Sequence, residues 1–236
     1  MMLRNFLTLL LILGVSAPTM AEWTGLGEVG VVAARGNTET DTVNGRVELE
    51  FTRERWTNGS VVSGVYSRDA DETRASRLVL ANKTEYELSE RSYVLGALRY
   101  DRDRFTDYRY QTTASLGYGH HFLDTERHKL SGEVGPGVRY AELRESAETD
   151  TDFIVRGFLK YGWQISETAE LKNRLLVESS TDNTFTENEL SVTVAINDRL
   201  ALKAGLAARH NTDVEPGTKS TDTLTTVNLV YNFRRD

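Results

Sequence analysis

From residue 22 to residue 233, apolar and polar residues alternate along the chain, in runs separated by short polar segments. The run from 43 to 51 shows this best. One parity carries the apolar residues Val43, Val47, Leu49 and Phe51, and the other carries the polar residues Asn44, Arg46, Glu48 and Glu50. Because successive side chains of a β-strand point to opposite faces, one face of such a strand suits hydrocarbon and the other suits water. Repeated around a closed sheet, the pattern predicts an all-β, antiparallel transmembrane β-barrel of the outer-membrane type, apolar outside and polar inside.

The first 21 residues have the form of a secretory signal peptide. Arg4 precedes a short apolar run from Phe6 to Val15, and the segment that ends at Ala21 offers small residues at the two positions that signal peptidase reads. The apolar run is too short to span a bilayer as a helix. We therefore expect residues 1–21 to be cleaved and residues 22–236 to form one barrel domain in the cell outer membrane of a Gram-negative bacterium.

The composition is compatible with such a barrel. The mean hydropathy of −0.43 is low, but only alternate residues of a barrel strand meet lipid, so the average hides the signal. The chain contains no cysteine, and its stability is expected to come from the closed hydrogen-bonded sheet. The 28 basic and 35 acidic residues give a formal net charge of −7. The basic residues are scattered at strand spacing, which gives no indication of nucleic-acid binding.

The alternating runs predict about twelve strands, an even number as in bacterial barrels. The expected spans are 23–35, 42–55, 59–68, 75–88, 92–102, 108–123, 128–141, 151–165, 169–180, 185–196, 199–210 and 221–234. Short connections alternate with generally longer, more acidic ones. Since outer-membrane barrels have tight periplasmic turns and longer outer loops, both termini are expected in the periplasm.

Aromatic residues on the lipid-facing parity support this orientation. They fall at both ends of the predicted strands. The set at the short turns is Trp23, Phe51, Tyr86, Phe122, Trp163 and Phe233, and the set at the longer loops is Tyr100, Tyr110, Tyr140 and Phe153. Two such sets are typical of the aromatic girdles of a membrane barrel. The alternative is a soluble β-protein with aromatic residues in its core, which has no need of two rings at fixed heights.

The inward parity carries charges of both signs. The residues expected to form a lumen charge network are Glu28, Arg46, Glu48, Glu50, Arg77, Lys83, Glu85, Glu87, Arg99, Asp101, Arg139, Arg156, Lys160, Arg174 and Glu178. The same parity also carries Arg109, Lys129, Glu133, Lys172, Glu187, Glu189, Lys203 and Arg209. Opposite charges on neighbouring strands are expected to pair. Twelve strands lie between the barrels that enclose only side chains and those that enclose a channel, so both a filled barrel and a narrow hydrophilic pore remain open.

Four inward glycines on consecutive predicted strands bear on the same question. Gly117 and Gly119 lie on one strand, and Gly135 and Gly137 lie on the next. They would create space, receive long basic side chains from the opposite wall, or simply permit the strands to curve.

The sequence offers little support for catalysis or metal binding. A hydrolase needs a nucleophile, a base and an orienting group within hydrogen-bond reach, and His210 has no serine two or three residues away on its strand. His120 and His121 are adjacent, so they point to opposite faces and cannot chelate together. One loop gathers acidic residues around Arg144, namely Glu142, Glu145, Glu148, Asp150 and Asp152. It would attract divalent cations or serve only as a solvated face. We expect no catalytic residue, no metal and no cofactor.

Several motifs, taken in order, resemble a known family. Their positions are Gly36, Asn37 and Thr38 in ARGNTET; Asp103, Arg104 and Phe105 in DRDRF; Gly135 and Gly137 in GPGVRY; and Asp222 with the closing YNF. The mature chain resembles the YdiY-like family of outer-membrane proteins, which are described as salt-induced and whose domain has no assigned function. The resemblance implies fold and location but no activity. Arg234 to Asp236 depart from it, because they follow the terminal aromatic residue at which barrels often stop.

These observations predict a passive or weakly channel-forming envelope protein, porin-like in form, with a link to salt or osmotic stress implied by the resemblance. The alternative is a non-channel structural or interaction barrel with a closed, salt-bridged lumen; an outer-membrane lipid hydrolase is disfavoured. An autotransporter translocator would need a passenger and a helix before the first strand, where only a few residues are expected. The expected partners are outer-membrane lipid and lipopolysaccharide. The barrel-assembly machinery is expected to recognise Tyr231 and Phe233. The oligomeric state is open.

Overall fold

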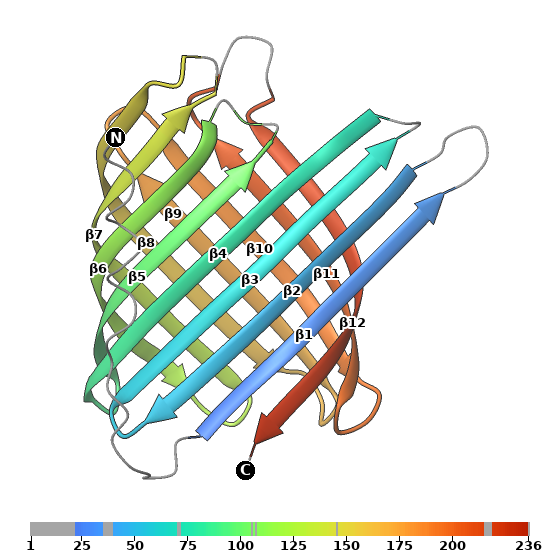
Figure 1. Cartoon of the computed structure of the whole chain (residues 1–236). Coiled ribbons are helices and arrows are strands. Elements are labelled where there is room, and N and C mark those ends of the chain that lie inside the picture. Colours follow the sequence, from blue (N-terminus) through green and yellow to red (C-terminus); the bar gives the residue numbers. More distant parts are fainter. Residues whose placement is uncertain are drawn as a thin grey trace.

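Twelve antiparallel strands form one closed barrel in the computed structural model of the chain (Figure 1). The structure describes residues 22–34, 40–69, 72–104, 106, 108–144, 146–214 and 219–235. Outside these residues lie the predicted signal peptide and the sequence-predicted positions Gly36, Asn37, Thr38, Phe105 and Glu145. Among the described residues, no helix is both long enough and apolar enough to cross a membrane.

The strands follow the alternating runs of the sequence one by one. They are β1 (Glu22–Ala34), β2 (Thr40–Arg53), β3 (Trp56–Asp69), β4 (Glu72–Ser89), β5 (Ser92–Asp103), β6 (Tyr108–Asp124), β7 (His128–Leu143), β8 (Thr149–Gln164), β9 (Ala169–Ser179), β10 (Thr184–Ala195), β11 (Leu200–Asn211) and β12 (Thr221–Arg235). The predicted fold class and strand number are confirmed. No boundary differs from the predicted one by more than three residues.

The two ends of the barrel differ. The start of β1 and the end of β12 lie at one end, together with the tight turn between β2 and β3 (Figure 1). We call this the turn end. The opposite end carries the connections from β1 to β2 and from β7 to β8, and we call it the loop end.

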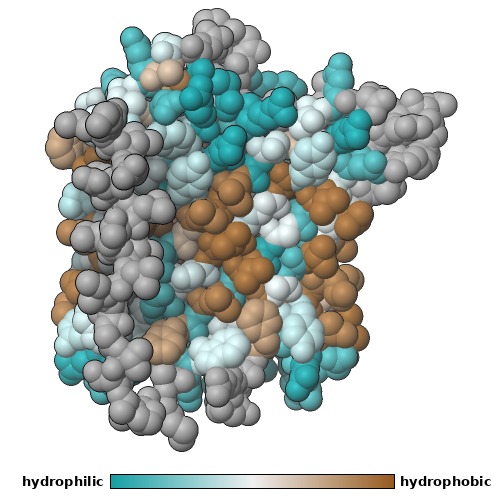
Figure 2. Space-filling view, viewed as in Figure 1, coloured by the Kyte–Doolittle hydropathy of each residue, from teal (hydrophilic) through white to brown (hydrophobic). Residues whose placement is uncertain are grey.

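The outer face of the wall is apolar, because the apolar parity of each strand points outward. Leu116, Val155 and Leu202 are examples of apolar side chains that are exposed there. Figure 2 shows apolar residues over the middle of the wall and hydrophilic ones above and below. Aromatic rings meet near both ends of the strands, in the pairs Trp23–Phe233, Trp56–Tyr86, Tyr100–Tyr110 and Tyr110–Tyr140. This is the surface that a bilayer requires.

A small packed core fills the inner face of β5 to β8. Tyr93, Leu95 and Ile154 are buried there. A Cβ atom at Gly119 would lie 2.2 Å from the ring of Tyr93, and one at Gly135 would lie 1.9 Å from the carbonyl oxygen of Leu116. The inward glycines therefore accommodate a neighbouring strand's side chain and the close approach of β6 and β7, rather than basic side chains from the opposite wall.

The seam between β1 and β12 is paired along only part of its length. The ladder joins Trp23–Val29 to Leu229–Arg235 and stops there, although β1 stays paired with β2 as far as Ala34. From the sequence we expect the last strand to pair with the first around Gly27 to Ala33. The pairing is confirmed, and so are residues 27–29 of the range, whereas residues 30–33 have no β12 partner in the ladder. Pairing begins and ends about four residues nearer the turn end, and in Figure 1 the two strands diverge toward the loop end.

Candidate functional site: the charged lumen

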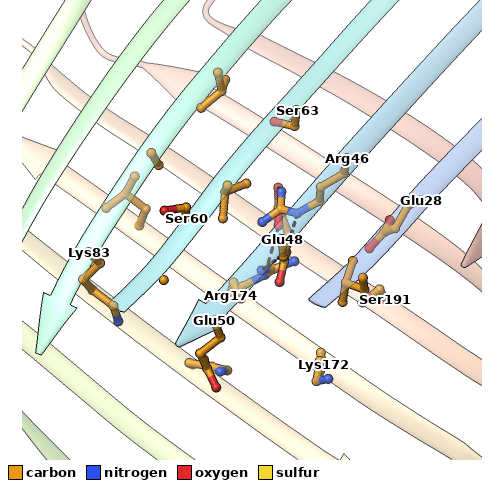
Figure 3. A pocket seen from close by; sticks show the side chains of 18 of the residues that line it. Glu28, Arg46, Glu48, Glu50, Ser60, Ser63, Lys83, Lys172, Arg174 and Ser191 are labelled. Carbon is orange, nitrogen blue, oxygen red and sulfur yellow. Dashed lines mark hydrogen bonds and ion pairs between the residues drawn. The ribbon is translucent and has the colours of Figure 1, made fainter. Parts of the chain in front are cut away.

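A large cavity occupies the lumen. Its volume is about 1400 Å³, and its lining runs from Thr24 and Arg199 near the turn end to Arg77 and Arg209 deeper inside. Figure 3 shows charged side chains from opposite walls of the barrel pointing into it. The lumen therefore holds open space as well as charged side chains that reach into it.

One set of bridges crosses the lumen toward the loop end. Arg77 on β4 donates hydrogen bonds to Asp101 on β5, at 2.5 Å, and to Glu187 on β10, at 2.9 Å. Arg99 approaches the same carboxylate of Glu187 at 3.3 Å. Since β10 lies on the far side of the barrel from β4, these contacts span the lumen. We call Arg77, Arg99, Asp101 and Glu187 the upper strut.

A further contact reinforces this level. Arg209 on β11 donates to Asp103 at 3.2 Å, again from one wall to the other. A pocket of only about 50 Å³ lies at the upper strut, and its lining extends to Asp103, Tyr108 and Asp222. Toward the loop end the lumen is therefore bridged from wall to wall, and the space beside the bridges is small.

A second strut crosses nearer the turn end. Arg174 on β9 bonds to Glu48 on β2 at 3.0 Å and to Glu189 on β10 at 3.1 Å. Arg46 also pairs with Glu48, and its contact with Glu189 measures 3.7 Å. Figure 3 shows Arg174 reaching Glu48, which also pairs with Arg46. We call these four residues the lower strut.

Two carboxylates are fully satisfied at the wall. Glu133 on β7 has a side chain that is 2% exposed, and it accepts hydrogen bonds from Lys83 at 2.5 Å, from Arg156 at 2.9 Å and from the hydroxyl of Tyr93 at 3.1 Å. Such pairing offsets the high cost of burying a charge.

Glu28 is the other satisfied carboxylate. It accepts from Lys203 at 2.7 Å and from the amide of Asn228 at 3.1 Å. Because Glu28, Lys203 and Asn228 lie on β1, β11 and β12, this cluster ties the three strands together at the point where the β1–β12 ladder ends.

The residues expected in the lumen network all lie on the inner parity. Beyond the struts and the two carboxylate clusters, Arg139 pairs with Asp152, and Glu85 lies 2.6 Å from Lys83. Glu178 is buried beside Thr113. Glu50 and Lys160 face the cavity, whereas Glu87 is exposed at the turn end.

Two residues that parity assigned to the lumen lie elsewhere. Arg109 is half exposed and bonds to Glu142, because the register shifts at the start of β6. Lys129 is 74% exposed at the turn end, where its nearest carboxylate is Asp124 at 3.5 Å. Strand ends and bulges break the strict alternation on which the parity argument rests.

The pairs that cross the lumen could not be predicted from the sequence. Opposite charges are expected to pair between neighbouring strands, which holds for Arg77–Asp101 but not for Arg77–Glu187 or Arg174–Glu48. No local signal identifies such pairs, because they join residues 110 and 126 positions apart. The alternation of the strands places Glu133 and Glu187 in the lumen, but it does not show that each of them pairs with two basic residues.

One serine–histidine contact appears that the sequence did not suggest. Ser92 Oγ lies 3.1 Å from His120 Nδ1 and accepts a hydrogen bond from Tyr118 at 2.8 Å, on the outer parity near the turn end. His121 points inward instead and packs on Tyr93. The two adjacent histidines thus face opposite sides, as expected.

The acidic loop is dispersed rather than gathered. Asp152 pairs with Arg139 in the lumen, and Glu142 pairs with Arg109. Arg144 donates to the backbone carbonyl oxygens of the β5–β6 connection instead of neutralising its own loop. Within the described ranges, no group of three or more metal-ligating side chains is present.

The family-motif residues have structural surroundings. Asp103 bonds to Arg209, and Asp222 lies opposite Arg209 in the β11–β12 ladder. The backbone N–H of Arg104 donates to the carbonyl of Ser76. Gly137, like Gly135, lies against the backbone of β6. A model of the family described as "protein of unknown function, DUF481" matches residues 27–233.

The chain belongs to this family. Among curated proteins it is similar to the uncharacterized protein YdiY of Escherichia coli (strain K12), with 26% identity over 210 residues that cover 86% of this chain and 81% of that protein. The resemblance found in the sequence motifs is confirmed.

Solved structures show the same fold at low sequence identity. An outer membrane channel from Pseudomonas putida F1 superposes with a TM-score of 0.52 at 11% identity, covering 93% of this chain and 97% of that one. The NanC porin gives 0.52 at 8% identity, covering 89% and 97%. The translocator domain of the autotransporter NalP from Neisseria meningitidis gives 0.50 at 13% identity, covering 93% and 90%. The fold is that of Gram-negative outer-membrane barrels.

Proposed function

We propose that this protein is an integral outer-membrane barrel that conducts ions and small solutes weakly, with the upper strut as its constriction. The observation that carries the proposal is the bridging of the lumen by Arg77, Arg99 and Glu187. Below these contacts the cavity has a volume of about 1400 Å³, and a pocket of only about 50 Å³ lies at their level. Charged rings and narrow hydrophilic passages are what limit and select ions in pores.

The alternative is a closed structural barrel. The two struts favour it, because each ties strands on opposite walls together and fills part of the lumen. Removing one partner of such a buried ion pair lowers the stability of the protein, because it leaves the other charge uncompensated. The two proposals differ in whether water passes the upper strut.

Conductance in planar lipid bilayers separates them. The wild-type protein is expected to give small, resolvable steps, and Arg77→Ala, which removes the centre of the upper strut, is expected to enlarge them at least twofold. Arg109→Ala is the matched control, since it removes the same charge from an ion pair outside the lumen. A large wild-type conductance that Arg77→Ala leaves unchanged would indicate an open pore. Silence of both folded proteins would establish the closed barrel.

The proposal extends to orientation and partners. We place the turn end in the periplasm and the loop end outside, with the barrel wall in contact with outer-membrane lipid and the loops near lipopolysaccharide. Protease treatment of intact cells tests this: a cleavage site inserted in the β7–β8 connection should be cut, and one inserted in the β2–β3 turn should not.

We also propose that the protein has no enzymatic activity and that any role in salt stress follows from conductance. The Ser92–His120 contact does not suggest a hydrolase, since the second partner of Ser92 is Tyr118 and His120 packs on Phe122. A deletion strain tests the salt link. Its growth in high salt should be altered, and the wild-type gene should restore it while the gene for Arg77→Ala should not.

A further inference from the structure

The partly paired seam leaves two strand edges without ladder partners. Beyond Val29, the remaining β1 residues Gly30–Ala34 are paired only with β2, and β12 residues Thr221–Asn228 are paired only with β11. In a bilayer, unpaired backbone N–H and C=O groups at a strand edge cost several kcal/mol each unless something satisfies them. We therefore expect another group to hydrogen-bond to the strand edges at this gap.

The cavity reaches this gap from the inside. Its lining includes Leu224, Thr226 and Asn228 on the unpaired part of β12, and Asn44 on β2. At the loop-end side of the cavity, the upper strut bridges the lumen and a small pocket lies beside it. The side wall between β1 and β12 is consequently a second boundary of the cavity. Other ladders, such as that of β8 and β9, also stop short of one strand's end, but among the described strand pairs only β1 and β12 both continue for five residues or more beyond the last ladder pair.

The two sides of the gap differ in chemistry. On the inner side, Asn44 donates a hydrogen bond to Asn228 at 2.8 Å, at the foot of the gap. The bridge passes over Gly30, where a Cβ atom would lie 2.1 Å from the side-chain oxygen of Asn228. On the outer side, Val31 and Val227 are exposed. A passage with amides inside and valines outside matches a molecule with a polar head and an apolar tail.

We propose that the gap is a lateral portal, through which a lipid-like amphiphile places a hydrogen-bonding head in the lumen while its tail stays in the bilayer. The head would meet Asn44 and Thr226, beside the Asn228 amide that Glu28 and Asn44 already engage. Its oxygen atoms would satisfy N–H groups of the two edges that have no ladder partner. An added strand would satisfy the same edges, but it would close the cavity off from its own amide lining. The portal goes beyond the proposed conductance and does not depend on it.

Photo-crosslinking from inside the lumen tests the portal. Benzoylphenylalanine is placed at Leu224, which lines the cavity beside the gap, or at Val61, which lines it on β3 away from the gap. A third variant carries it at Val62, which faces outward and reports insertion. The folded protein is placed in vesicles of phosphatidylethanolamine and phosphatidylglycerol that contain a phospholipid with a fluorescent acyl chain.

Labelling by the phospholipid is expected at Val62 and at Leu224, with Leu224 at least fivefold above Val61. A disulfide that extends the ladder, Val31→Cys with Val227→Cys, should lower the Leu224 signal to the Val61 level, and reduction should restore it. The control pair Val29→Cys with Leu229→Cys lies where the ladder is already formed and should change nothing. Equal labelling at Leu224 and Val61, with strong labelling at Val62, would overturn the portal. A crosslink from Leu224 to a second copy of the chain would overturn it in favour of an added strand.

Discussion

Arg77 and Glu187 meet across the lumen at 2.9 Å, although they lie on strands β4 and β10 on opposite walls of the barrel. Each side chain is only 13% exposed. The pair ties two distant parts of the wall together and stands where the large cavity ends. It is therefore both a brace of the barrel and a bridge across the lumen at the end of the large cavity.

The brace has a measurable energy. Glu187→Gln and Arg77→Met should each lower the free energy of unfolding by up to about 3 kcal/mol, because each leaves a poorly solvated charge with one partner fewer. Of the ion pairs among the described residues, Arg77 then keeps only Asp101, and Glu187 keeps only Arg99. The double variant should lose clearly less than the two single losses combined. Urea unfolding in lipid vesicles, followed by tryptophan fluorescence, measures this. Lys129→Met, in an exposed pair, should change the value by less than about 0.5 kcal/mol. Strict additivity of the two single variants would contradict the brace.

Gly135 should tolerate no side chain. A Cβ atom there would lie 1.9 Å from a backbone oxygen, that of Leu116, which cannot move aside without distorting β6. Gly135→Ala should therefore reduce the fraction that refolds into a heat-modifiable barrel on unboiled gels. Gly157→Ala is the matched control, since nothing lies within 4 Å of its added Cβ. Equal refolding of the two variants would show that β6 and β7 are not in close contact there.

Phe233 should be essential for assembly. Its ring packs against Trp23, with centroids 6.0 Å apart, and covers Gly25 at the point where β12 closes on β1. Phe233→Ala should strongly reduce the folded protein recovered from outer membranes. Deletion of Arg234 to Asp236 should have a smaller effect, because it removes only the last two pairs of the β1–β12 ladder. The reverse order of effects would contradict the proposed assembly signal.

The whole protein should behave as an integral membrane protein. Its outer parity exposes apolar residues such as Val47, Leu116 and Val155, which require lipid. After cell fractionation it should remain with the outer membrane through a carbonate wash, and its gel mobility should change on boiling. Recovery as a soluble periplasmic monomer would contradict the membrane assignment.

Most of the barrel wall could be predicted from the sequence. The alternation of Val43 to Phe51 fixes which side chains face outward, because the two-residue period of a strand is a local property. The same reasoning placed Glu48, Arg77 and Glu187 in the lumen. It failed at Arg109, where a register shift interrupts the period.

The sequence by itself therefore determined the strands, their inward and outward faces, and the family. Only the tertiary structure decided which charges meet. Arg77 reaches Glu187 and Arg174 reaches Glu48 because the number, tilt and stagger of all twelve strands set which residues oppose each other across a closed barrel. The same global geometry ends the β1–β12 ladder at Val29. No local pattern contains that information, since it belongs to the closure of the sheet and not to any one strand.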